Sequence, residues 1–181
     1  MKKIILTVFA ASSLLLYSTQ AFALINFSVG VPLSHTITGK YSDGSEIKSE
    51  GVSGIFIQVG VPMLPGIGMD SYKTKIKSED PFELETMIYN LYYLLPIPII
   101  NLTIGVGTGS TTFKCSGCDA YFDKGSASQW YASFGMPIIP LFDLHLSYRS
   151  VSSKIKIKSI AGGGEHDLSG NVMGLGIGFN F

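Results

Sequence analysis

Apolar and polar residues alternate one by one along most of the chain after position 24, which is typical of β-strands with two different faces. In the final segment, 173–181, every second residue is large and apolar, and the residues between are glycine or Asn180. This pattern fits a barrel strand whose large side chains face lipid. The same alternation predicts strands at 25–33, 55–63, 67–77, 86–95, 100–107, 129–136, 142–149 and 173–181. Eight strands, an even number, allow a barrel to close with both chain ends on one side.

The connections between these segments are of two kinds. The short, proline-rich ones are 62–65, 96–98 and 137–140. The longer, polar ones are near 42–51, 78–85, 115–126 and 159–169. Proline lacks a backbone donor and is expected at strand ends and turns. Short turns on one side and long loops on the other are typical of outer-membrane barrels, so we expect periplasmic proline turns and outward-facing loops.

Composition narrows the class of protein. The chain has 181 residues, enough for one domain, of which 46% are hydrophobic and 14% charged, whereas soluble domains carry about 25% charged residues. Thirteen basic and thirteen acidic residues cancel, so nothing indicates a nucleic-acid partner. No apolar run of about 18 residues follows position 23. A secreted soluble β-protein and a closed barrel in lipid are the two classes left, because an open sheet cannot satisfy its backbone in lipid.

The first 23 residues have the features of an export signal. Lys2 and Lys3 precede an apolar stretch from Ile4 to Tyr17, and Ala21-Phe22-Ala23 fits a cleavage site. A retained membrane anchor is the alternative, but the stretch is shorter than the roughly 20 residues that a span needs. We therefore assign 1–23 to a signal peptide and expect 24–181 to form one barrel domain.

Residues 24–181 resemble the small eight-stranded outer-membrane β-barrels of Gram-negative bacteria. The resemblance rests on the signal peptide and on the alternating last strand, which ends in Phe179 and Phe181. It implies an all-β, antiparallel up-and-down barrel, a monomer of the outer membrane with a structural or surface-interaction role. It also implies that the barrel-assembly machinery reads Phe179 and Phe181, and that lipid and lipopolysaccharide are partners. A barrel of this size is too narrow for a large pore.

Two runs of alternate lysines continue outward-facing rows beyond the apolar part of their strands. They are Lys73, Lys75 and Lys77, and Lys154, Lys156 and Lys158. Contact with lipopolysaccharide phosphates is one interpretation, because lysine binds phosphate as a point charge. A solvated strand extension whose charges prevent edge pairing is the other. Aromatic residues that could form interfacial girdles are Tyr41, Tyr89, Tyr93, Trp130 and Tyr148.

Four polar residues share the predicted inner face of one strand: Asp143, His145, Ser147 and Arg149. We expect a network in which Arg149 and His145 neutralise Asp143 and Asp70, because buried charges must be paired. His145 and Ser147 are also similar to the H-x-S pair of the lipid A deacylase barrels, so a lipid-modifying enzyme is the alternative function. That pair faces lipid in the deacylases but inward here, and alternate strand residues are about 6.6–6.8 Å apart at Cα, which favours the network.

Glycines on the predicted inner faces leave space in the lumen. They are Gly105, Gly107, Gly174, Gly176 and Gly178. Tyrosines such as Tyr92 and Tyr131 could fill this space, or a pocket could admit a small ligand or an acyl chain.

The two cysteines, Cys115 and Cys118, lie in one predicted outer loop. A disulfide is the expected state in an oxidising periplasm, and a redox pair or free thiols are the alternatives. A zinc site would need two more ligands, so no metal or other cofactor is predicted.

Overall fold

The computed structural model of the protein describes residues 25–41, 43–61, 64–78, 82–97, 100–139, 141–159 and 163–180. The predicted signal peptide and Phe181 lie outside the described residues. The elements are β1 (Asn26–Ile37), β2 (Ser49–Gly60), β3 (Gly66–Ile76), β4 (Phe82–Ile97), β5 (Ile100–Lys114), α2 (Cys118–Tyr121), β6 (Gly125–Ile139), β7 (Phe142–Ile157), β8 (Gly164–Asp167) and β9 (Gly170–Asn180). In the described part of the chain, no helix is long and apolar enough to cross a bilayer.

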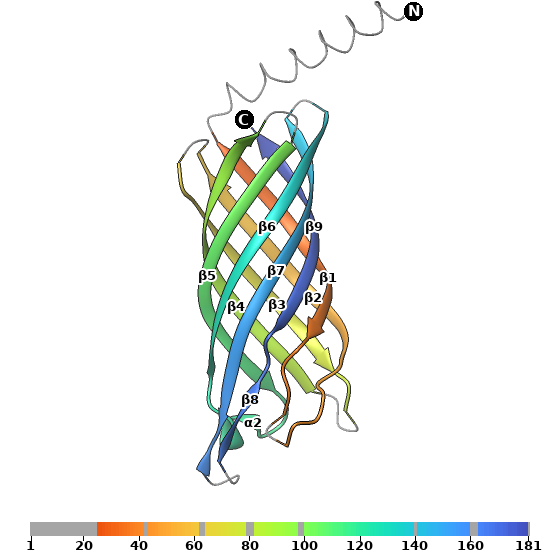
Figure 1. Ribbon diagram of the computed structural model, residues 1–181, viewed down its shortest axis with the longest axis vertical. Coiled ribbons are helices and arrows are strands. Elements are labelled where there is room, and N and C mark those ends of the chain that lie inside the picture. The colour runs from red at the N-terminus through yellow and green to blue at the C-terminus, as the bar shows by residue number, and fades with distance from the viewer. Residues whose placement is uncertain are drawn as a thin grey trace, which may run out of the picture.

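The strands close into an antiparallel barrel (Figure 1). Each strand from β1 to β7 pairs with the next, and β9 pairs with both β7 and β1 to complete the ring of eight. The ninth strand, β8, pairs with the end of β7 beyond the stretch that β9 occupies. The predicted eight-stranded barrel is therefore confirmed, and the chain is not a two-sheet sandwich.

The two ends of the barrel differ. β1 begins and β9 ends at one end, which we call the turn end, while α2 and β8 lie at the opposite end, which we call the loop end (Figure 1). Side chains alternate between outside and inside around the ring as the sequence predicts. On β5 and β6, for example, Val106 is 60% exposed and Trp130 is 55% exposed, whereas Tyr131 is 1% exposed.

The strands are longer at the loop end than the alternation of apolar residues predicts. β4 begins at Phe82, β5 continues to Lys114, and β7 continues to Ile157. In these extensions the polarity is reversed, because Leu84 and Ile155 point inward while charged and hydroxyl side chains point outward. The connection expected at 78–85 is consequently short, and β8 occupies part of the loop expected at 159–169.

The interior is divided into layers. The apolar cluster at the loop end contains Ile47, Ile76, Leu84, Phe113, Cys118, Ile155 and Leu168. The next apolar cluster contains Phe56, Tyr72, Ile88, Ala127, Val151 and Val172. Polar side chains fill the remaining interior toward the turn end, so this barrel has a packed core as well as a polar lumen.

Candidate functional site

A buried ion pair between β3 and β7 lies inside the barrel. The Arg149 Nε donates a hydrogen bond to Asp70 Oδ2 at 2.9 Å, and their side chains are 3% and 0% exposed. Gln129 on β6 donates to the same carboxylate oxygen at 2.5 Å and lies 2.7 Å from the amide oxygen of Asn90 on β4. Because buried charges are tolerated when they are paired and hydrogen-bonded, this cluster makes the two ionised side chains compatible with a closed interior.

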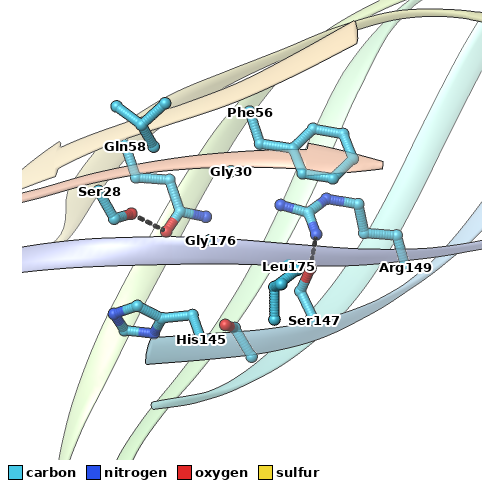
Figure 2. Close-up of a pocket in the computed structure, with 11 residues that line it drawn as sticks. Ser28, Gly30, Phe56, Gln58, His145, Ser147, Arg149, Leu175 and Gly176 are labelled. Atoms are coloured by element: carbon cyan, nitrogen blue, oxygen red, sulfur yellow. Dashed lines mark hydrogen bonds between the residues drawn. The ribbon is translucent and has the colours of Figure 1, made fainter. Parts of the chain in front are cut away.

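Aromatic rings hold the other side of the Arg149 guanidinium. Its Cζ lies 3.6 Å from the centroid of the Phe56 ring and 5.0 Å from that of Tyr131, a cation–π arrangement. Its Nη1 donates to the hydroxyl of Ser147 (Figure 2). Gln58 on β2 donates to the Tyr131 hydroxyl at 2.7 Å. The guanidinium is thus fixed from several strands at once.

A second polar group surrounds Asp143 near the turn end. Asp143 Oδ2 accepts hydrogen bonds from the amides of Asn101 at 2.5 Å and Asn180 at 2.6 Å. The Nε2 of His145 lies 4.0 Å from the same oxygen. Amide donors from β5 and β9 therefore stabilise this carboxylate.

The four residues predicted for the lumen network all face inward, but they form two groups. Arg149 pairs with Asp70 and not with Asp143, because six steps along an extended strand separate Asp143 from Arg149 by about 20 Å. The alternation pattern did not predict the side-chain amides that surround the Asp70 and Asp143 carboxylates, which are Asn90, Asn101, Gln129 and Asn180. Their inward parity was visible, but the side chain that each one meets depends on the register between strands.

Large inner side chains lie over glycines on the neighbouring strand. Gly105 is opposite Tyr131, and a Cβ built on Gly105 would lie 2.3 Å from the tyrosine ring. Gly66 is opposite Tyr92, with the same 2.3 Å approach. The glycines therefore create the space that these tyrosines fill.

A small cavity lies in the lumen beside His145, Ser147 and Gly176, and its volume is about 20 Å³ (Figure 2). One water needs about 10–15 Å³ on this scale, so the cavity is too small for an acyl chain. Ser147 also donates to the carbonyl of Gly174 at 3.2 Å and accepts from Arg149. The structure therefore gives no support to the His145–Ser147 enzyme interpretation.

The outer loops converge on the apolar cluster at the loop end. The imidazole of His166 on β8 packs 5.2 Å from the Tyr41 ring and 5.9 Å from the Phe122 ring. Cys118 is buried in the same cluster, and its sulfur is adjacent to that of Cys115, with the Cα atoms 5.3 Å apart. Among the described residues, no group of His, Cys, Asp and Glu side chains is arranged to hold a metal. We use the name outer cap for the apolar cluster at the loop end together with Tyr41, Phe122 and His166, which pack on it.

The predicted lysine runs lie outside the barrel near the loop end, and several of them face acidic residues. Lys73 lies 3.8 Å from Glu83, and Lys154 lies 3.1 Å from Glu165. Lys158 lies 3.9 Å from Asp123. These exposed pairs are weak and exchangeable, because water screens them on both sides.

No family model and no curated protein matches the sequence. Among solved structures, Neisserial surface protein A is 12% identical with a TM-score of 0.56, covering 87% of this chain and 96% of its own. Outer membrane protein W of E. coli is 13% identical with a TM-score of 0.52, covering 88% of this chain and 98% of its own.

The outer membrane protein AlkL, solved in lipid bilayers, is 15% identical with a TM-score of 0.52, covering 88% of each chain. At these identities the likeness concerns the fold, and it extends over nearly the full length of each relative. The chain therefore has the fold of the small eight-stranded outer-membrane β-barrels.

Proposed function

We propose that the protein spans the outer membrane as a monomeric barrel with a filled lumen and a structural or surface-interaction role. The observation that carries the proposal is the apolar outer surface of the closed ring. Ile67, Val106 and Phe134 point outward and are 63%, 60% and 55% exposed. A soluble barrel would bury such side chains, whereas a bilayer solvates them, and closure of the ring gives each barrel strand two neighbours to pair with.

The height of the apolar surface supports this proposal. On β6 the outward row from Trp130 to Ile138 is free of charged side chains. Eight steps of about 3.4 Å give about 27 Å along the strand, or about 20 Å across a bilayer at a tilt of about 40°. The result is close to the band of about 25 Å that outer-membrane barrels present to lipid.

The packed interior favours a structural or surface role over a pore. The Asp70–Arg149 pair and the aromatic rings beside it block the lumen in its polar layer, and the outer cap covers the loop end. With the turn end in the periplasm, the cap and the lysine runs face the cell surface. We propose that the runs 73–77 and 154–158 contact lipopolysaccharide there.

Export and assembly complete the proposal. Residues 1–23 direct export, and the barrel-assembly machinery reads Phe179 and Phe181. Phe179 packs 6.3 Å from Phe27 and 5.0 Å from Phe142 at the turn end, which supports a role at the seam where the barrel closes. We also propose that Cys115 and Cys118 form a disulfide that anchors α2 to the outer cap.

Cell fractionation combined with gel migration tests the proposal. We expect the processed chain in the outer-membrane fraction, and we expect unheated samples to migrate faster than boiled ones because the barrel stays folded in SDS. Recovery of the folded chain in the soluble periplasmic fraction would contradict membrane residence.

A further inference from the structure

Two grooves lie on the outer surface, on either side of the outward ridge of β4. The larger one, here the β5 groove, has a volume of about 440 Å³ and is lined by Leu91, Tyr93, Ile104, Val106, Trp130 and Ala132, among others. The smaller one, the β3 groove, has a volume of about 380 Å³ and is lined by Ile57, Val59, Ile67, Gly68, Met69 and Tyr89, among others. Both are therefore part of the surface proposed to face lipid.

Less exposed outward residues that lie beside more exposed ones form the floors of these grooves. In the β5 groove, Ala132 has the smallest outward side chain, while Trp130 and Val106 beside it are 55% and 60% exposed. In the β3 groove, the outward side chains of Ile57 and Met69 are half-buried beside Ile67 and Tyr89, which are 63% and 61% exposed. A narrow apolar groove of this kind fits a hydrocarbon chain, because the chain then contacts side chains along its sides as well as below.

A charged patch lies beyond the grooves toward the loop end on the same three strands. Lys114 on β5 is 3.4 Å from Glu85, and Lys73 on β3 is 3.8 Å from Glu83. Lys75 is exposed and forms no ion pair with the residues that the structure describes. Lys73 follows Met69 of the β3 groove by four steps, or about 13 Å along the strand. A phosphate at this level could replace Glu83 on Lys73, because exposed ion pairs are weak.

We propose that this face binds one lipopolysaccharide molecule, with acyl chains in both grooves across the β4 ridge and a phosphate at Lys73 and Lys75. The inference rests on the proposed membrane residence and specifies where the lipopolysaccharide contact lies. We infer lipopolysaccharide as the occupant for two reasons. The grooves are continuous with the surface proposed to face lipid, which suits acyl chains, and the lysines on the loop-end side suit a phosphate. A phospholipid or a second copy of the chain in the grooves would be a different outcome.

Trp130 provides a direct test, because it is the only tryptophan of the chain and lines the β5 groove. The mature protein is reconstituted into phosphatidylethanolamine vesicles that contain a brominated phosphatidylethanolamine, with and without unlabelled lipopolysaccharide. The brominated lipid quenches Trp130. We expect lipopolysaccharide to protect the fluorescence by more than simple dilution of the brominated lipid explains.

Matched variants localise the effect. Ala132→Phe fills the β5 groove and should reduce protection to the dilution value, whereas Val31→Phe, on the outward face of β1, should leave protection unchanged. The double variant Lys73→Gln/Lys75→Gln should weaken protection by lowering lipopolysaccharide affinity. Heat-dependent gel migration confirms that each variant is folded before the fluorescence is compared.

The possible results distinguish a failure of the lipopolysaccharide site from a failure of the proposed membrane residence. One result would be that lipopolysaccharide protects Trp130 of the parent protein no more than dilution of the brominated lipid explains. That result would overturn the lipopolysaccharide site but leave the proposed membrane residence intact. Protection that depends on protein concentration and needs no lipopolysaccharide would indicate a second copy in the groove and would also overturn it. No quenching at all by brominated lipid would contradict membrane residence itself.

Discussion

At the scale of single residues, the lumen is filled by pairs that complement each other in size or in charge. Tyr131 lies over Gly105, and Arg149 meets Asp70 while stacking on Phe56. Each pair joins different strands, so the interior connects distant parts of the ring. Such a lumen resists compression and leaves little freedom for substitution, because a close-packed interior responds to changes of one methyl group.

The glycine–tyrosine fit predicts that Gly105→Ala destabilises the barrel. The added Cβ would lie 2.3 Å from the Tyr131 ring, and that ring is fixed by burial and by its bond to Gln58. Overpacking of this kind costs about 1–3 kcal/mol. Urea unfolding in vesicles measures the loss. Gly51→Ala on β2 is the control, because its Cβ would meet nothing within 4 Å. Equal stability of the two variants would show that the Tyr131 side chain moves aside without cost, and would contradict the prediction.

The buried ion pair predicts a strong asymmetry between single and double substitutions. Arg149→Met leaves the Asp70 carboxylate buried without its cation, which should cost about 3–5 kcal/mol in the free energy of unfolding. Replacing both partners, as Asp70→Leu/Arg149→Met, removes the unpaired charge and should recover most of that loss.

The same urea titrations compare the three proteins. If Arg149→Met unfolds at the midpoint of the parent protein, the pair does not stabilise the lumen. If the double variant is as unstable as Arg149→Met, packing around the guanidinium is the dominant contribution.

At the scale of elements, the polarity of the strands reverses between their two halves. On β7, the row with Leu146 and Tyr148 is outward and apolar near the turn end, but it continues into Lys154 and Lys156 near the loop end. The inner row changes in the opposite direction, from His145 to Ile155. This reversal fits the proposed membrane residence, in which one half of the strand contacts lipid and the other half extends into water.

This reversal predicts a position-dependent response to lysine along β5. Ile104→Lys places a charge within the apolar band and should lower the free energy of unfolding by about 2–4 kcal/mol. Thr112→Lys, outward on the same strand beside Glu85, should change stability little. Ile104→Val controls for the loss of size. Urea midpoints in vesicles provide the comparison, and equal tolerance of Ile104→Lys and Ile104→Val would contradict lipid exposure.

The outer cap should loosen in acid because of His166. Burial lowers the pKa of His166, and the nearby Asp43 carboxylate opposes this shift more weakly. An unpacked histidine titrates near 6.5. The imidazole that packs against Tyr41 and Phe122 stays neutral to a lower pH. The unpacked cap therefore binds more protons, and cap stability is full above about pH 6.5 and falls as the pH decreases.

Amide hydrogen exchange of the segments 38–48 and 163–169 at about pH 8 and about pH 5, corrected for intrinsic rates, measures this opening. We expect faster exchange at the lower pH in the parent protein, and we expect His166→Phe to remove the difference. A pH dependence that persists in His166→Phe would assign the effect to another group.

At the scale of the whole molecule, the fold is a closed ring with an apolar outer surface, a filled lumen and a capped loop end. Each of the eight strands of the ring pairs with two neighbours, including the seam between β1 and β9, while β8 pairs only with β7. We expect the stability of the barrel to come from this closed pairing and from the packed interior. These properties fit the proposed structural role, in which the barrel is a rigid support for its outer loops.

Much of this molecule could be predicted from the sequence. Alternation identified the eight barrel strands, their faces and the inward positions of Asp70 and Arg149. It did not identify the extensions of β4 and β5, because Leu84 and Phe113 are inward in a region where outward apolar residues were sought. The extension of β7 was predicted only as one interpretation of the lysine run 154–158. The outer cap was also missed, since it depends on contacts between loops that are far apart in the chain.

The most direct test of the account is whether the outward row of one strand touches lipid. Spin labels are attached to single cysteines at 100, 102, 104 and 106 on β5 and at the inward positions 101 and 103, with Cys115 and Cys118 replaced by serine. In outer-membrane vesicles, we predict high oxygen collision rates and low nickel-chelate collision rates at the even positions, and low rates of both at the odd ones. High nickel-chelate rates at 104 and 106 would place that row in water and contradict the account.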